Sequence, residues 1–480
     1  MLDWKKLLND KRRKPKSGEP PIALTQLKQK EVRTEHERDY DRILFSTPVR
    51  RLADKTQVFP LEKNDSVRTR LTHSHEVSNL ARSLGIDIAF NENLFSEQQE
   101  PQRNVPAILA AVGLAHDLGN PPFGHQGEGA IQSWVADNSD ELFGDGTLDE
   151  AMKNDFLKFE GNAQTLRLLT RLQLTNDDYG LNLSYGTLAA LMKYPVGSGQ
   201  TSKDHVSSKK HGFFQSEKEI INDVWENTGL SAKIRHPLTY LMEACDDIAY
   251  SVLDAEDAVK KNLVSFSDLI SYLKHQKNKD KTIEYVIEAS CEKNKEFRED
   301  NLSPNELNDI SMQMFRVYAI GAMISDVKKA FMDNYAIIMK GELKQDLIAV
   351  SNSAVFCKLL KKFDRMHAYR HRSVLEVELT GYNTIRQLMD YFWKAITDRE
   401  NHNELGSDRK SPFSSYAYSR ISENYRRVFE SENNNMPIRY KELQLLTDMI
   451  SGMTDSFAIS LLDELEKYDV LGALERKNVN

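Results

Sequence analysis

Cysteine is scarce in this sequence, and long apolar runs are missing. The 480-residue chain has three cysteines, and they lie far apart. Such spacing provides neither a disulfide framework nor a CxxC metal knuckle. The first residues, MLDWKK, lack the apolar stretch of a secretion signal, and no apolar run is long enough to cross a bilayer. We therefore expect a cytoplasmic protein with no membrane partner.

A large excess of positive charge is also missing. The formal net charge is −8, which argues against a protein built mainly to coat nucleic acid. One local exception is the basic run KRRKPK at residues 11–16. A solvated tail and a contact with single-stranded DNA are both compatible with this run, and a solvated tail is the more common outcome. We treat residues 1–33 as a basic N-terminal arm.

Sustained strand patterns and internal repeats are absent as well. Helical periodicity dominates the chain, which predicts an all-α fold. Apolar residues make up 40% and charged residues 28% of the sequence, as in ordinary globular proteins. The one exception to the helical pattern is the stretch 374–379, where apolar and charged residues alternate. This alternation predicts a short strand in a small hairpin.

Two histidines and two carboxylates lie close together in AHDLGNPPFGHQGE at residues 115–128, directly after an apolar helical run. Ile108, Val112 and His116 fall on one helical face, so His116 should point into the core. A buried imidazole followed by the carboxylate of Asp117 costs free energy unless both groups are satisfied, and a divalent cation satisfies both. A hydrogen-bonded pair at the helix end is the alternative.

Further candidate ligands occur on two other predicted helices. His73 lies on the apolar stripe of its helix with Val77, whereas His75 lies on the polar side. Asp246 shares a face with Met242, and no Lys or Arg lies within one turn to pair with it. Two imidazoles and two carboxylates from three helices form a mixed nitrogen and oxygen set. Such a set suits Mn²⁺, Mg²⁺, Fe²⁺ or Co²⁺ better than a closed structural zinc.

A second pair, His125 and Glu128, follows the turn that contains Pro121 and Pro122. If the chain is helical after Gly124, the i, i+3 spacing brings the carboxylate to the imidazole. The carboxylate would raise the imidazole pKa and fix its tautomer, as proton transfer near neutral pH requires. The alternative is that Glu128 only caps the helix.

Together, these residues resemble the signature of the HD-domain phosphohydrolases, an all-helical superfamily. More narrowly, the chain resembles the bacterial deoxyguanosinetriphosphate triphosphohydrolases from about residue 34 to residue 260 and again at 440–455. The resemblance rests on KTQVF at 55–59, RTRLTHS at 68–74, HDLGNPPFGH at 116–125, FEGNAQ at 159–164, ACDDIAY at 244–250 and ISGMTD at 450–455. Between about 262 and 435 it is weak.

The resemblance implies an HD-domain hydrolase core over residues 34–270, with residues 271–480 packed on it as additional C-terminal helices in one large domain. It implies hydrolysis of a deoxynucleoside triphosphate, dGTP above all, to the deoxynucleoside and inorganic triphosphate. Mn²⁺ or Mg²⁺ is the implied metal, with Fe²⁺ or Co²⁺ as alternatives. The implied metal ligands are His73, His116, Asp117 and Asp246, and the implied catalytic residues are His125 and Glu128. A homo-oligomer, commonly a hexamer, is also implied.

Substrate contacts follow from the same resemblance. The matching positions are Lys193 and Tyr194 for the polyphosphate, Gln57 and Asn162 for the sugar and the rest of the substrate, and Tyr250 for a ring packed against the deoxyribose. Lys193 and Tyr194 precede a loop rich in Gly and Ser at 196–208, which suggests a lid over phosphate. An ordinary surface loop, and buried structural amides at Gln57 and Asn162, are the alternatives.

Two other functions are compatible with the same residues. An HD-domain site can cleave phosphodiesters or phosphomonoesters, and a nucleotide-regulated protein that binds single-stranded nucleic acid would carry a similar pocket. The presence of His125 and Glu128 beside four ligands disfavours a protein that only binds.

Overall fold

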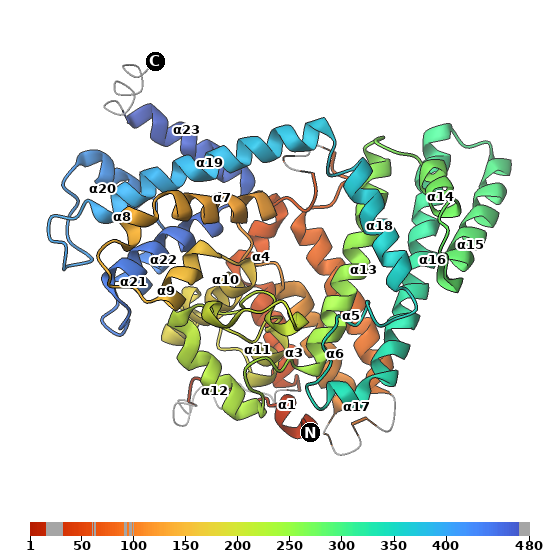
Figure 1. Ribbon diagram of the computed structural model, residues 1–480, viewed down its shortest axis with the longest axis horizontal. Helices are drawn as coiled ribbons and strands as arrows, with labels where there is room; N and C mark the ends of the chain where they lie inside the picture. The colour runs from red at the N-terminus through yellow and green to blue at the C-terminus, as the bar shows by residue number, and fades with distance from the viewer. Residues whose placement is uncertain are drawn as a thin grey trace.

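The computed structural model describes residues 1–469 apart from 16–31, 60, 62, 63, 91–93, 96, 97 and 99. Over these residues the chain is built from α-helices (Figure 1). Isolated β-bridges take the place of a sheet in the described ranges, so the predicted all-α fold is confirmed. Within the same ranges, every helix is too short or too polar to cross a lipid bilayer.

The helices of the first half surround the candidate site. They are α1 (Trp4–Leu7), α3 (Glu35–Leu44), α4 (Thr47–Arg51), α5 (Arg70–Ala89), α6 (Pro101–Ala115), α7 (Gly124–Asp137), α8 (Ser139–Phe143), α9 (Glu150–Leu157), α10 (Gly161–Arg167), α11 (Tyr185–Leu191), α12 (Lys218–Thr228) and α13 (Pro237–Lys260). Short turns join some of them: 3-10 turns at Leu52–Asp54, Leu174–Tyr179, Ser198–Gln200, Val206–Ser208 and Gln215–Glu217, and a π-helical turn at Leu168–Leu172.

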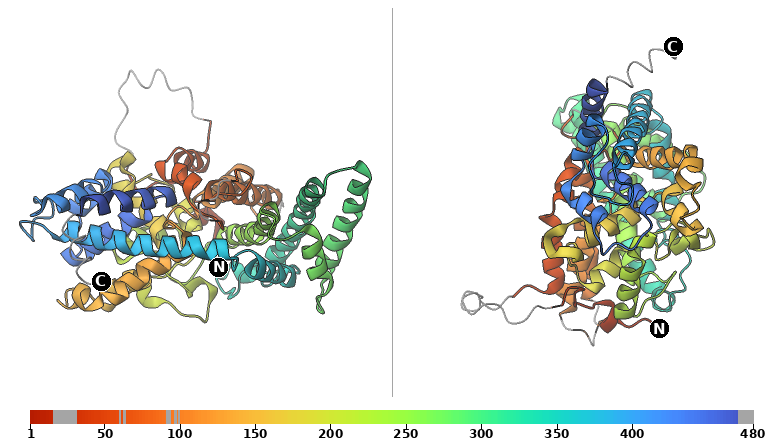
Figure 2. Two further views of the ribbon diagram at one scale, coloured as in Figure 1. Left: turned by 90° about the horizontal axis from the view of Figure 1, so that it is seen from above. Right: turned by 90° about the vertical axis from the view of Figure 1, so that its left-hand side faces the viewer.

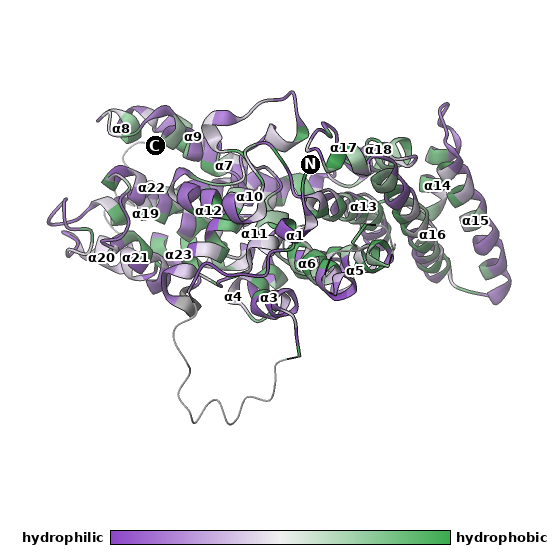
Figure 3. Cartoon of the chain, turned by 90° about the horizontal axis from the view of Figure 1, so that it is seen from below, coloured by the Kyte–Doolittle hydropathy of each residue, from purple (hydrophilic) through white to green (hydrophobic). Residues whose placement is uncertain are grey.

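The helices of the second half divide into two groups. They are α14 (Phe266–Lys274), α15 (Lys281–Phe297), α16 (Pro304–Asp333), α17 (Tyr335–Ile338), α18 (Ala354–His367), α19 (Arg372–Thr397), α20 (Pro412–Ser419), α21 (Glu423–Glu430), α22 (Ile438–Ser451) and α23 (Asp455–Tyr468). Helices α14 to α16 project from one end of the molecule, α20 to α23 lie at the other end, and α19 runs along the upper edge between α18 and α20 (Figures 1 and 2). Ile283 and Val286 of α15 are buried, and hydrophilic residues cover its outer side (Figure 3).

Helix α6 lies at the centre of the fold. From Val105 to its end, all but one of its residues are buried, because it packs against α3, α5, α11 and α13. Ile108 and Val112 are fully buried, as their helical phase predicted. A helix that is apolar on every side is held in place by its neighbours, so the residue that ends α6, His116, has a fixed position.

The hairpin predicted at 374–379 is wrong. These residues belong to α19, which runs from Arg372 to Thr397. The buried residues include Val374, Gly381, Ile385 and Leu388. Successive members of this set are seven, four and three residues apart, as expected for one face of a helix. The local alternation of apolar and charged residues was a coincidence, because packing of the whole helix along α7 decides the structure.

The N-terminal segment contacts the body of the molecule up to Lys14. Trp4 and Leu7 are buried, and the Arg12 guanidinium lies 2.6 Å from the buried carboxylate of Asp39. These contacts differ from the solvated tail expected for the basic run, because the sequence pattern did not identify Asp39 as a buried partner for Arg12. Residues 16–31 of the predicted arm lie outside the described residues.

A buried ion network joins the two halves of the chain. The Arg167 guanidinium on α10 donates to both carboxylate oxygens of Asp448 on α22, with Nη2 at 2.7 Å from Oδ2. Its Nη1 donates to Glu217 at 2.9 Å. All three side chains are at most 4% exposed, so each charge depends on the others for compensation.

Replacing Arg167 by Leu should lower the free energy of unfolding by about 3–5 kcal/mol, because two buried carboxylates lose their cation. Urea unfolding followed by circular dichroism measures the change. The control is Arg427→Leu on the exposed side of α21, which should alter stability by less than about 0.5 kcal/mol. Equal unfolding midpoints for the two variants would contradict the role given to this network.

Candidate active site

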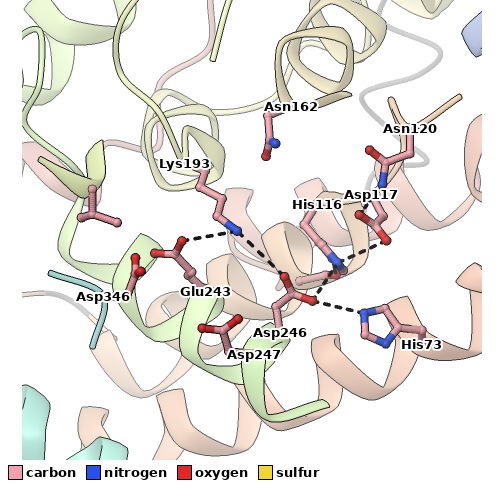
Figure 4. A network of polar contacts seen from close by, with 12 residues as sticks. His73, His116, Asp117, Asn120, Asn162, Lys193, Glu243, Asp246, Asp247 and Asp346 are labelled. Atoms are coloured by element: carbon pink, nitrogen blue, oxygen red, sulfur yellow. Dashed lines mark hydrogen bonds and ion pairs between the residues drawn. The ribbon is translucent and has the colours of Figure 1, made fainter. Parts of the chain in front are cut away.

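Three potential metal ligands come together from three helices (Figure 4). Nε2 of His73 on α5 lies 3.2 Å from Oδ1 of Asp246 on α13. Nε2 of His116, at the end of α6, lies 3.4 Å from the same oxygen. The ligand atoms of all three residues lie within 4.8 Å of one another. The predicted inward orientation of His73 is confirmed, since its side chain is 1% exposed, whereas His75 is exposed.

The chemistry of these side chains fits a divalent cation. Nδ1 of His116 donates to the Gly113 carbonyl at 2.7 Å, which leaves Nε2 directed at the carboxylates. That buried Nε2 has no hydrogen-bond partner among the described residues. Histidine ligands commonly donate their second ring nitrogen to a backbone carbonyl in this way. Burial alone would lower the pKa of His116, but the Asp117 and Asp246 carboxylates outweigh it and raise the pKa to about 9.

Asp117 lies at the edge of this group. Its Oδ2 is 3.6 Å from Nε2 of His116 and forms an ion pair with Arg70, while its Oδ1 accepts from Nδ2 of Asn120 at 2.6 Å. Burial opposes ionisation of Asp117, but Arg70 and His116 outweigh it and lower its pKa to about 2. Sequence reasoning missed Arg70. The available signal was its position one turn before His73 on the same inward stripe.

His125 and Glu128 meet as their spacing predicted. Nδ1 of His125 lies 3.0 Å from Oε2 of Glu128, and the imidazole is 80% exposed. Glu128 is buried, and its Oε1 accepts from the Gly161 backbone N–H at 2.9 Å. The hydrogen bond that Nδ1 of His125 donates to the Glu128 carboxylate raises the pKa of His125 despite partial desolvation. The pair therefore presents an exposed imidazole that stays protonated to a higher pH than usual.

The turn before this pair has a left-handed backbone. Phe123 has φ of 59° and Gly124 has φ of 54°, the region that favours glycine. A Cβ on Gly124 would also lie 2.7 Å from a guanidinium nitrogen of Arg70. Arg70 therefore contacts Asp117 on one side and the start of α7 on the other.

Lys193 lies beside the candidate metal ligands. Its Nζ is 3.3 Å from Oε1 of Glu243 and 4.0 Å from Oδ2 of Asp246. Burial would lower the pKa of Lys193, but Glu243 outweighs it and raises the pKa well above its usual value.

Tyr194 is buried, with the cations of Lys193 and Arg235 within 6 Å of its ring centre. Burial raises the pKa of Tyr194 to about 12, so its hydroxyl stays neutral.

The loop after Tyr194 is packed down on the protein. Val196, Ser198 and Ser207 are buried. Nζ of Lys209 lies 3.7 Å from Asp346. Nζ of Lys210 lies 2.7 Å from Glu160. Both lysines therefore have carboxylate partners, although their side chains are 42% and 41% exposed.

Two further predicted substrate residues are Gln57, between α4 and α5, and Asn162, at the start of α10. Oε1 of Gln57 is buried without a hydrogen-bond partner in the described part of the chain. Nδ2 of Asn162 donates to Glu160 at 2.7 Å, and its side chain points toward Lys193 and His116 (Figure 4). Buried, unpaired amide oxygens are uncommon in proteins, and Gln57 shares this property with Gln164 and Gln444, so both the substrate role and the structural role of Gln57 stay open.

Tyr250 lies one turn after Asp246 on α13. Its ring centre is 6.0 Å from that of Tyr369, whose hydroxyl donates to the buried Asp254. Burial raises the pKa of Tyr250 to about 12. Sequence reasoning missed Tyr369 and Asp254. Tyr369 is 115 residues from Asp254 in sequence, and only the packing of α18 on α13 brings them together.

Curated relatives span almost the whole chain. It is 37% identical over 477 residues to a deoxyguanosinetriphosphate triphosphohydrolase-like protein of Listeria monocytogenes, covering 97% of this chain and 99% of the relative. It is 33% identical over 493 residues to a protein of the same name from Synechocystis, covering 97% and 99%. It is 30% identical over 515 residues to a deoxyguanosinetriphosphate triphosphohydrolase of Yersinia pestis, covering 95% and 97%.

The chain belongs to the deoxyguanosinetriphosphate triphosphohydrolase family. The relatives confirm the resemblance predicted from the six sequence phrases. No protein-family model matches the chain.

For this family member, Asp246→Ala should weaken Mn²⁺ binding by more than about 100-fold, because the carboxylate oxygen nearest to both imidazoles is removed. Titration with Mn²⁺, followed by the electron paramagnetic resonance signal of the free ion, measures the affinity. His75→Ala is the control and should bind like the wild type. Unchanged binding by the Asp246 variant would rule out a metal at this position.

Glu128→Gln should lower the pKa of His125 toward its ordinary value, because the hydrogen-bonded carboxylate is lost. The raised pKa means that the interaction stabilises the fold fully below the ordinary histidine pKa of about 6.5, and that this stabilisation disappears as the pH rises through the raised value. Nuclear magnetic resonance of ¹³C-labelled histidine gives the midpoint, with the His75 resonance as internal reference. An identical His125 midpoint in both proteins would contradict the pairing.

Proposed function

We propose that the protein hydrolyses deoxynucleoside triphosphates, with dGTP as the preferred substrate, to the deoxynucleoside and inorganic triphosphate. The observation that carries this proposal is the distance of 4.0 Å between Nζ of Lys193 and Oδ2 of Asp246. A cation suited to the outer phosphates thus adjoins the candidate metal ligands. The names of the relatives support the same reaction.

A divalent metal would be held by His73, His116, Asp117 and Asp246, with Mn²⁺ or Mg²⁺ the best candidates and Fe²⁺ or Co²⁺ as alternatives. Imidazole nitrogens combined with carboxylate oxygens suit these ions. When bound, the metal would supply polarisation of a phosphoryl oxygen and would make water more acidic.

The protein's own groups would orient the triphosphate and move the proton. Lys193 would neutralise the outer phosphates, so that the sugar-proximal phosphorus is the one presented to water. Water attacks the α-phosphorus, and the bond from this phosphorus to the 5′-oxygen breaks. His125, kept protonated by Glu128, donates a proton to the departing 5′-oxygen. The proton that the attacking water loses passes to solvent, from which the exposed His125 is protonated again. The triphosphate leaves in one piece.

Selection of the deoxyribose would depend on Tyr250, Gln57 and Asn162. A tyrosine face packed against the sugar leaves no room for a 2′-hydroxyl. The unpaired Oε1 of Gln57 would accept a hydrogen bond from the substrate, because burial without a partner costs free energy.

The proposal is tested by incubating the protein with each dNTP and each NTP, in Mn²⁺ or Mg²⁺, and separating the products by ion-exchange chromatography. Deoxyguanosine and triphosphate are expected from dGTP, with NTPs cleaved poorly. Formation of dGMP with pyrophosphate, or of dGDP with phosphate, would contradict the proposal. Turnover of a cyclic dinucleotide or a nucleoside monophosphate in the same assay would favour the phosphodiesterase or phosphomonoesterase alternative.

His125→Ala should lower kcat by about 10²- to 10⁴-fold while metal and nucleotide affinity stay close to wild type, because a positioned proton donor is lost. Lys193→Ala should raise KM at least as strongly as it lowers kcat. Steady-state kinetics with dGTP measures kcat and KM separately for each variant. A variant of His125 that changes KM alone would show that the imidazole only binds substrate.

We also propose that the active species is a homo-oligomer, with a hexamer as the expected assembly. Light scattering coupled to size-exclusion chromatography gives its mass. Binding of single-stranded DNA without turnover, with a steep dependence on salt, would instead favour the nucleic-acid-binding alternative.

A further inference from the structure

A carboxylate from the C-terminal half joins two loops that bear candidate site residues. Asp455 lies at the start of α23 and is 2% exposed. Its Oδ2 accepts from the Thr56 backbone N–H at 3.0 Å and from the Thr56 hydroxyl. Its Oδ1 accepts from the Phe123 backbone N–H at 3.0 Å. One side chain therefore takes three hydrogen bonds from two segments that are far apart in sequence.

Both segments lead directly to residues of the proposed reaction. Thr56 precedes Gln57, and Phe123 lies two residues before His125. Phe123 also has the left-handed φ of 59°, a conformation that a non-glycine residue adopts at a cost of about 1–3 kcal/mol unless its surroundings impose it. The hydrogen bond from Phe123 to Asp455 is part of those surroundings.

Two further contacts connect the same turn to the C-terminal half. Nζ of the buried Lys55 donates to the carbonyls of Asn120 at 2.6 Å and Ser451 at 2.8 Å. On α19, a Cβ added to Gly381 would lie 2.2 Å from the Phe123 ring, so the ring packs directly on the helix backbone. The turn at Phe123 is thus enclosed by α19 and by residues 451–455.

We propose that Asp455 is a positioning residue for the reaction: its carboxylate holds the Gln57 loop and the His125 turn in one mutual arrangement. This inference rests on the proposed function and gives a role to ISGMTD at 450–455, which lies far from the other family phrases in sequence. Asp455 contacts neither substrate nor metal ligands in this role. It acts through the backbone of Thr56 and Phe123.

A purely structural role for Asp455 makes a different prediction. An acidic residue in the first turn of a helix stabilises that helix through its dipole, and this effect would change stability and leave the site unaltered. Asp463 lies on the exposed side of the same helix. Asp463→Asn is the control for the loss of a carboxylate from this helix, whereas a dipole effect of Asp455→Asn would appear as lower stability with unchanged kinetics of the folded protein. Asp455→Asn keeps the shape of the side chain and replaces one accepting oxygen by a donor.

Asp455→Asn should lower kcat/KM for dGTP by roughly 10- to 100-fold, because small misplacements of catalytic groups have effects of this size. Mn²⁺ affinity and the fraction of folded protein should match those of Asp463→Asn. Thr56→Val removes only the hydroxyl contact, so it should raise KM with little change in kcat. Asp455→Asn should change both parameters, because it disturbs both segments.

A second measurement does not depend on turnover. In ¹³C-histidine spectra of the full chain, Asp455→Asn should shift the His125 resonance and move its titration midpoint, while Asp463→Asn leaves both unchanged. If the wild type forms no triphosphate but His125 responds in this way, the proposed function fails and the positioning role of Asp455 stands. Wild-type kcat/KM together with an unchanged His125 resonance in folded Asp455→Asn would overturn the positioning role. Loss of activity that only follows a lower folded fraction would overturn it as well.

Discussion

The carboxylate of Asp246 between two imidazoles is the interaction on which the rest of the site depends. Burial opposes ionisation of Asp246, but His116 and Lys193 outweigh it and hold its pKa well below the usual value. An ionised group in such surroundings is stable only while its partners keep their places. Those partners come from α5, α6 and the segment after α11, so the packing of these elements and the electrostatics of the site are inseparable.

The C-terminal half supports this arrangement from outside the site. Asp448 on α22 fixes α10 through Arg167, and Asp455 on α23 contacts the turn before α7. Neither carboxylate is a candidate ligand. These buried bonds connect α22 and α23 to elements next to the candidate site, and loss of either bond would leave a buried charge or donor uncompensated.

Much of the site could be predicted from sequence because helical phase decides which side chains point inward. The phase of α5 distinguished His73 from His75, and the apolar run of α6 led directly to His116. The i, i+3 spacing of His125 and Glu128 likewise follows from helix geometry. The roles of Gln57, Asn162, Tyr194 and Tyr250 came from resemblance alone and stay predictions.

What the sequence could not reveal depends on contacts between distant segments. Tyr369 reaches Tyr250 only because α18 packs on α13. Arg12 is largely enclosed because Glu35 and Asp39 accept its hydrogen bonds. The strand expected at 374–379 failed for the same reason: six residues of alternating pattern carry less weight than the packing of a 26-residue helix. Local sequence patterns predict which face of a helix is buried. They do not predict which residues from distant segments contact that face, and only the structure shows these contacts.

The position of the broken bond tests the central claim most directly. Hydrolysis of dGTP in water enriched in ¹⁸O, with mass spectrometry of both products, distinguishes attack at phosphorus from attack at carbon. We expect the label to enter inorganic triphosphate and the deoxyguanosine 5′-oxygen to remain unlabelled. Label in the deoxyguanosine would contradict a site in which Lys193 and the candidate metal ligands present the α-phosphorus to water.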